Sequence, residues 1–228
     1  MAQDIANGWL EASAVGRLES SVDASPTDGA RLSERNEKDA ADLADVQHLR
    51  QGNERALSCL MERHGEKLFH YLIRCLRNEE DAADLAQETF LRVFQNRDRF
   101  DGRNSFSTWL YAIATNLVKD RYRYRSRHPQ VSMDAENDSN GGTLADTLRE
   151  DRPVPAEDLQ IEERKRTIRE AVAQLPEDLR APLILSEYEE LSHNEIAVVL
   201  KCSAKAVEMR IYRARQQLRT TLAGLWKG

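Results

Sequence analysis

The stretch between Asp81 and Arg127 constrains this chain most, because its character changes three times within 47 residues. Residues 81–95, DAADLAQETFLRVFQ, predict a helix with an acidic polar face. Residues 96–109, NRDRFDGRNSFSTW, predict a polar loop that ends in aromatic residues. Residues 110–127, LYAIATNLVKDRYRYRSR, predict a helix that begins apolar and ends as a basic stripe with interleaved tyrosines. Such a tandem indicates a module that binds a protein and a nucleic acid together.

The distribution of charge supports nucleic-acid binding, although the net charge is −6. Residues 1–47 carry a net charge of −6 and residues 129–163 one of −8, which leaves +8 on residues 48–128 and 164–228. Local charge, and not the total, decides whether a surface binds phosphates. Two basic units separated by acidic segments are therefore compatible with DNA binding.

Apolar residues recur at spacings of three and four in two parts of the chain, and no segment alternates as a strand does. Proline, glycine and acidic residues interrupt this pattern between the two parts, as in a linker. We expect an all-α fold of two helical domains joined by a flexible acidic linker, the C-terminal domain containing a helix-turn-helix. The predicted boundaries are a disordered N-terminal extension at residues 1–40, a first domain at 43–127, a linker at 128–156 and a second domain at 157–226.

Residues 191–219, LSHNEIAVVLKCSAKAVEMRIYRARQQLR, have the pattern of a helix-turn-helix. Ser192 with Glu195 predicts a capping box, and Ser203 can cap the following helix. Residues 201–219 contain six bases and one acid, which suits a helix that enters a major groove. The alternative is a basic amphipathic helix packed on a bundle with solvated arginines. The outer face of the second helix comprises Lys205, Glu208, Met209, Tyr212 and Arg213.

Four residues share one face of the predicted 81–95 helix: Asp84, Gln87, Glu88 and Leu91. Polar groups around a leucine are typical of a protein-docking surface. The alternative is an ordinary solvated helix face.

The following loop and helix combine features that hold single-stranded nucleic acid. Basic side chains, which can bind phosphates, alternate along the helix with aromatic rings, which can stack on nucleobases. These residues are Lys119, Arg121, Tyr122, Arg123, Tyr124, Arg125 and Arg127. The loop offers close backbone approach and small hydrogen-bonding groups, as a pocket for an unstacked base needs, at Gly102, Asn104, Ser105 and Ser107. The alternative for the nearby aromatic residues Phe100, Phe106 and Trp109 is core packing, and for the two tyrosines partial burial.

The sequence predicts no metal site, cofactor or catalytic site. Cys59, Cys75 and Cys202 are odd in number and far apart, as buried or incidental thiols of a reducing compartment would be. An enzyme site would need His64, His70 and Cys59 to act with nearby acids, but no phosphate loop, nucleophile elbow or metal-ligand spacing accompanies them. The N-terminus lacks the pattern of a signal peptide, and no apolar run is long enough to span a membrane. We therefore expect a cytoplasmic protein.

Four segments together resemble bacterial RNA polymerase sigma factors of the extracytoplasmic-function group. They are DAADLAQETFLRVF, FSTWLYAIATNLVKDRYR, the residues Leu175, Pro176 and Arg180, and the helix-turn-helix sequence given above. The resemblance covers roughly residues 43–127 and 160–222. Two independent motif sets in the right order make it specific.

This resemblance implies a division of labour along the chain. The face of Asp84, Gln87, Glu88 and Leu91 would bind the coiled coil of the largest polymerase subunit, and the second domain its flap. The linker would run through the active-site cleft, and an anti-sigma protein would commonly hold such a factor inactive. Residues implied in reading and opening the −10 element are Gly102, Asn104, Ser105, Ser107, Lys119, Arg121 and Arg123. Those implied in reading the −35 duplex are Ser203, Lys205, Ala206, Glu208, Met209, Arg210 and Arg213.

Two departures from the family pattern affect promoter choice. Ala112 and Ile113 stand where primary sigma factors have paired tryptophans, which implies weaker melting and stricter promoter selection. Glu208 and Met209 replace residues common in the recognition helix, so Glu208 either accepts from a cytosine amino group or repels phosphates. The predicted function is promoter-specific transcription initiation without catalysis. The alternative is a standalone helix-turn-helix regulator.

Overall fold

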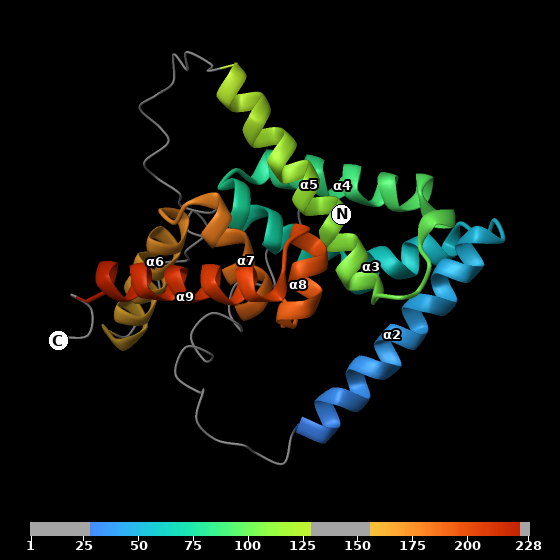
Figure 1. Ribbon diagram of the computed structural model, residues 1–228, viewed down its shortest axis with the longest axis horizontal. Helices are drawn as coiled ribbons and strands as arrows, with labels where there is room; N and C mark the ends of the chain where they lie inside the picture. The colour runs from blue at the N-terminus through green and yellow to red at the C-terminus, as the bar shows by residue number, and fades with distance from the viewer. Residues whose placement is uncertain (1–27, 129–155, 224–228) are drawn as a thin grey trace.

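The structure is a computed structural model that describes residues 28–128 and 156–223. Within these two ranges every regular element is helical and no strand occurs, which confirms the all-α prediction. The elements are α2 (Asp28–Arg50), α3 (Arg55–Leu76), α4 (Glu79–Gln95), the 3-10 helix η1 (Arg97–Arg99), α5 (Phe106–Arg127), α6 (Ala156–Ala173), α7 (Glu177–Glu187), α8 (His193–Leu200) and α9 (Ala204–Thr221) (Figure 1).

Local capping explains where several helices begin. The Asn78 side chain accepts from the backbone N–H of Asp81 at 2.8 Å, and three acidic residues in the first turn of α4 favour the positive end of the helix dipole. Ser192 and Glu195 form the predicted capping box at the start of α8. Ser203 caps α9, as predicted. These starts are therefore encoded within a few residues of each helix.

Helices α2 to α5 form the N-terminal unit. The helix α3 packs against α4 and α2, and α5 packs against α4. The apolar stripes of these helices meet in a core in which Leu60, Leu68, Leu72 and Leu110 are fully buried. The first helix begins earlier than the sequence indicates: α2 starts at Asp28, so the disorder expected of residues 1–40 does not extend to the last thirteen of them.

Helices α6 to α9 form the C-terminal unit, in which α8 and α9 are the predicted helix-turn-helix. Lys201 takes a left-handed conformation with φ of +54°, which turns the chain sharply between the two helices. Ile196 and Val199 of α8 pack with Val207 and Ile211 of α9 in the core of this unit. The opposite face of α9, away from Val207 and Ile211, therefore lies at the surface.

The two units lie against each other. The helix α8 packs on α5 and α7 packs on α3, as Figure 1 shows. Their buried apolar residues belong to one continuous cluster. The sequence predicted two units on a linker but gave no sign of this contact. The linker prediction falls on residues 128–156, most of which lie outside the described residues, as does the end of the second domain at residues 224–226.

Candidate protein-binding and nucleic-acid interfaces

The four predicted docking residues of α4 all line a surface groove between α4 and α5. The groove has a volume of about 840 Å³. Leu91 of α4 and Tyr124 of α5 expose 48% and 56% of their surface and both line this groove. Glu88 accepts from Arg92 Nε at 2.8 Å. The residues that line the groove are Asp84, Leu85, Gln87, Glu88, Leu91, Arg92, Leu117, Asp120, Arg121, Tyr124 and Arg127.

The basic residues of α5 fall into two groups: some pair with a buried acid of α4, and the others face outward. Arg121 and Arg125 both form ion pairs with Asp81, which is only 9% exposed at the start of α4. Arg123 is exposed and pairs with the exposed Asp120 at 3.1 Å. Lys119 is half-buried and also lies on α5. Arg121 thus has a structural partner that helix periodicity did not reveal, because Asp81 lies on another helix.

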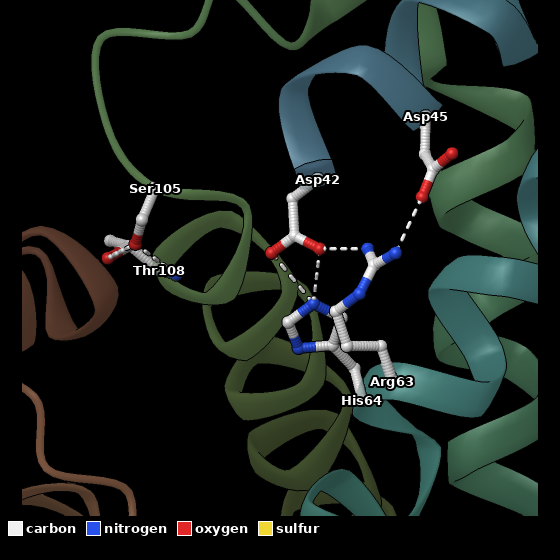
Figure 2. A network of polar contacts seen from close by, with 6 residues as sticks. All are labelled: Asp42, Asp45, Arg63, His64, Ser105 and Thr108. Carbon is white, nitrogen blue, oxygen red and sulfur yellow. Dashed lines mark hydrogen bonds and ion pairs between the residues drawn. The ribbon is translucent and has the colours of Figure 1, made fainter. Parts of the chain in front are cut away.

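The loop between η1 and α5 is shorter than predicted, because α5 already begins at Phe106. We refer to residues 100–105 as the α5 loop. Gly102 has φ of +73°, a conformation that favours glycine, and Asn104 is exposed. Ser105 is the N-cap of α5: its Oγ accepts from the Thr108 backbone N–H at 3.2 Å and lies 2.9 Å from Thr108 Oγ1 (Figure 2). Ser107, in the first turn of α5, is half-buried.

The aromatic residues around the α5 loop pack together. The Trp109 ring lies 5.2 Å from the Phe100 ring and 6.0 Å from the Phe106 ring, and both phenylalanines are buried. This favours core packing over base stacking for these three residues. Of the two tyrosines, Tyr122 is half-buried and donates its hydroxyl to the Cys75 carbonyl, whereas Tyr124 is exposed.

The outer face of α9 is free at the surface, as predicted. Lys205, Glu208, Met209 and Arg213 are exposed, and Ala206 and Arg210 are half-buried. Lys205 Nζ lies 3.1 and 3.0 Å from the two carboxylate oxygens of Glu208. This exposed pair places a positive charge beside the carboxylate of Glu208.

Contacts between the two units place α8 beside the α5 loop. A small cavity of about 120 Å³ is lined by loop residues Phe100, Asp101 and Asn104, by α5 and by Val198 of α8. Arg35 of α2 also pairs with Glu195 of α8. In this arrangement Val198 of the C-terminal unit lies beside Asn104, one of the residues predicted to capture a −10 base, although Asn104 itself is exposed.

A polar contact beneath this surface joins the same two units. Tyr111 of α5 donates its hydroxyl to the Glu189 carboxylate, and the Arg74 guanidinium lies 4.1 Å from the centre of the Tyr188 ring. Arg180 donates to the Cys75 carbonyl at 3.0 Å. Burial raises the pKa of Glu189, although the Tyr111 hydrogen bond and Arg74 act in the opposite direction.

The residues considered for an enzyme site have other surroundings. His64 is buried and bound to Asp42, while Cys59 is exposed. Burial and the neighbouring Arg74 lower the pKa of His70 to about 4. Within residues 28–128 and 156–223, no three His, Cys, Asp or Glu side chains are grouped to hold a metal ion. None of the helices described here is both long and apolar enough to cross a bilayer.

Comparison with known proteins identifies both units. Residues 60–128 match the family Sigma-70 region 2, and residues 165–218 match Sigma-70, region 4. The chain is similar to the RNA polymerase sigma-H factor of Pseudomonas aeruginosa, with 33% identity over 79% of this chain and 93% of that protein. It is also similar to the ECF RNA polymerase sigma factor SigW of Bacillus subtilis, with 34% identity over 79% of this chain and 96% of that protein.

Two solved structures share this fold. One is CnrH in complex with the cytosolic domain of CnrY, with a TM-score of 0.57 and 28% identity over 81% of this chain and 98% of that one. The other is the sigma factor RpoE in complex with the anti-sigma factor NepR from Bartonella quintana, with a TM-score of 0.55 over 73% of this chain and 96% of that one. The latter has 22% identity and supports the fold alone.

Proposed function

The chain belongs to the extracytoplasmic-function (ECF) group of the sigma-70 family, and on that premise we propose which of its surfaces carries out each step of promoter-directed transcription initiation. As a sigma factor, it binds core RNA polymerase and directs it to promoters. A standalone helix-turn-helix regulator would leave the region 2 unit without a task. We assign the region 2 domain to residues 43–127 and the region 4 domain to 157–226.

The groove between α4 and α5 is our proposed site for the coiled coil of the largest polymerase subunit. Leu91 and Tyr124 supply exposed apolar surface, and Asp84, Gln87 and Glu88 supply a polar rim. An apolar centre with a polar rim is the usual anatomy of a protein interface. This juxtaposition of an exposed leucine and tyrosine across two helices is the observation that carries the assignment.

The α5 loop and the outward face of α5 are our proposed −10 interface. Gly102, Asn104 and Ser107 would contact a captured base, while Lys119 and Arg123 would approach phosphates. Opening the duplex costs about a few kcal/mol per unstacked step, and base capture offsets part of that cost. Ser105 and Arg121 would contribute mainly by positioning, since their polar atoms already cap α5 and pair with Asp81.

The outer face of α9 is our proposed reader of the −35 duplex. Its N-terminal residues would meet base edges and its arginines the phosphates, as in other helix-turn-helix proteins. Because Glu208 is already paired with Lys205, we expect it to accept from a cytosine amino group rather than simply to repel DNA. The proposed contacts are Ser203, Lys205, Ala206, Glu208, Met209, Arg210 and Arg213.

The remaining assignments concern partners. We propose that residues 128–156 run through the polymerase active-site cleft, that the region 4 unit also meets the flap, and that an anti-sigma protein binds the free factor. The related CnrH was solved in complex with the cytosolic domain of CnrY, which supports a protein partner of this kind. We further propose that the protein has no catalytic activity of its own and acts in the cytoplasm, where polymerase works.

We also propose that the free protein binds promoter DNA weakly. The sequence supports this through its acidic segments, which oppose the approach of phosphates. The contact between the units adds a second reason, because Val198 of α8 lies beside the α5 loop and would hinder the approach of DNA there. Tight promoter binding by the protein alone in a gel-shift assay would contradict this part of the proposal.

Run-off transcription from genomic DNA of the host, with core polymerase, tests the central assignment. Discrete transcripts should require the protein and should disappear when Asp84, Gln87 and Glu88 are changed to alanine. A matched control changes three exposed polar residues away from the groove, Glu62, Glu170 and Gln174, to alanine and should transcribe normally. If both triple variants behave alike, the groove is not the polymerase site.

A further inference from the structure

We infer that α2 positions the α5 loop for −10 recognition, with Arg50, Leu43 and the Asp42–His64 pair as positioning residues. The inference rests on the proposed role of that loop in base capture. It assigns a promoter-specificity role to a helix that contributes none of the proposed DNA contacts. Three separate observations, placed before, within and after the loop, carry it.

Arg50, the last residue of α2, holds the chain just before the loop. Its Nε donates to the Arg97 carbonyl at 2.9 Å, and its Nη2 donates to the Asp98 carbonyl at 3.2 Å and to the Phe100 carbonyl. A guanidinium has a fixed fork of five N–H donors, so one side chain can hold several carbonyls at once. Through these bonds Arg50 fixes the direction in which the chain leaves η1.

Leu43 of α2 lies beside the middle of the loop. A Cβ atom placed on Gly102 would lie 3.5 Å from Leu43 Cδ1, so a side chain at this loop position would be in van der Waals contact with α2. Leu43 is 42% exposed, so it adds little to the core. It limits how far the Gly102 turn can move toward α2.

The Asp42–His64 pair supports the residue that follows the loop. Asp42 and His64 are both buried, and His64 Nε2 lies 2.9 and 2.8 Å from the two Asp42 oxygens (Figure 2). Since a carboxylate only accepts, Nε2 carries the proton and donates. The His64 ring packs 5.0 Å from the ring of Phe106, the first residue of α5. Burial lowers the pKa of His64, which favours this neutral ring at pH 7.

Arg63 of α3 also holds Asp42 in place. It binds Asp42 and also pairs with Asp45 at 2.9 Å, so Asp42 is held from α3 on two sides (Figure 2). The contacts of Arg50 and Leu43 come from α2 itself, whereas α2 reaches Phe106 through Asp42, which holds the His64 ring of α3. A site that captures an unstacked base must be held close to its productive geometry by supporting residues. We therefore expect a loosened loop to bind correct and incorrect −10 bases with similar affinity.

The test measures discrimination between −10 sequences by the holoenzyme. Fork-junction DNA from a promoter found by run-off transcription is compared with the same DNA carrying single −10 substitutions. Arg50→Gln should reduce the affinity ratio of the native to the substituted fork by about tenfold or more, because a displacement of about 1 Å in a binding geometry costs up to about 100-fold. Leu43→Ala should reduce it in the same direction. Arg55→Gln, at an exposed arginine on α3, is the matched control and should leave it unchanged.

Affinity for core polymerase and for −35 duplex is measured in parallel. A substitution that only disturbs the fold would lower both of these affinities together with the −10 discrimination. The inference is overturned if Arg50→Gln and Leu43→Ala discriminate as well as the wild type, or if their loss of discrimination is matched by equal losses in core and −35 binding. If the wild-type holoenzyme itself shows no −10 discrimination, the proposed function of the loop fails instead. A fall in discrimination alone supports the inference.

Discussion

The hydrogen bond from Tyr111 to Glu189 should control how firmly the two units hold together. Tyr111→Phe removes only the hydroxyl and keeps the ring that packs 5.2 Å from Tyr71. A hydrogen bond to a charged acceptor contributes about 1.5–3 kcal/mol. We call the form in which the two units are packed together closed, and a form in which they have separated open. Loss of the hydrogen bond should therefore shift the ratio of closed to open molecules by roughly 10- to 150-fold toward the open form.

Fluorescence energy transfer between the units measures this shift. One dye is attached to the exposed Cys59 of α3 and the other to α9 through Gln217→Cys, in a Cys202→Ser background; the third native thiol, Cys75, is buried. The transfer efficiency of the free protein should fall with Tyr111→Phe.

Tyr124→Phe is the control for this change, because it removes the hydroxyl of an exposed tyrosine on the same helix. Equal transfer in the two variants would refute the reasoning that the buried hydroxyl holds the closed form. The open variant should also bind single-stranded −10 DNA more tightly in the absence of polymerase, if α8 restricts access to the α5 loop.

The same contact should respond to pH in a defined direction. Burial raises the pKa of Glu189 in the closed form, whereas an open form would return it toward the ordinary carboxyl value. The closed form then takes up the proton more readily, so closure is strongest at low pH and weakens as the pH rises through the raised pKa. Glu189→Gln should strengthen closure at neutral pH and flatten this dependence. An unchanged pH profile would show that another group titrates.

Three further predictions concern stability. The pKa of His70 is lowered to about 4 in the folded protein, so the stability that this residue contributes is present above about pH 6.5 and is lost as the pH falls toward 4. His70→Gln should therefore reduce the fall in the urea midpoint between pH 7 and pH 5. An undiminished fall would exclude His70 as its source. Asp81→Ala leaves Arg121 and Arg125 without their shared carboxylate and should lower the free energy of unfolding by about 1–3 kcal/mol, whereas no measurable loss would mean that both pairs are solvated. Ser192→Ala should cost about 1 kcal/mol by removing the cap of α8, as urea denaturation would report, and a neutral result would show that Glu195 alone sustains the helix start.

Much of the candidate site could be predicted from the sequence, because it depends on residues close together in the chain. The face of Asp84, Gln87, Glu88 and Leu91 follows from the helical period alone. The helix starts at Ser192 and Ser203 follow from hydrogen bonds that span three residues. The pair of Lys205 and Glu208 could also have been predicted, because it joins neighbours on one helix face.

Other features depend on the tertiary structure, because they join residues separated by tens of positions in the chain. Asp81 meets Arg121 forty residues away, and Tyr111 meets Glu189 across the linker. Asp42 meets His64 only because α2 continues and packs on α3. Helix periodicity determines which face of each helix is apolar, but not which face of another helix it meets. The sequence by itself therefore determined most of the helices, the caps of α8 and α9 and the order of the two units. Only the packing of the helices decided which charged groups on different helices are paired and which surfaces remain exposed.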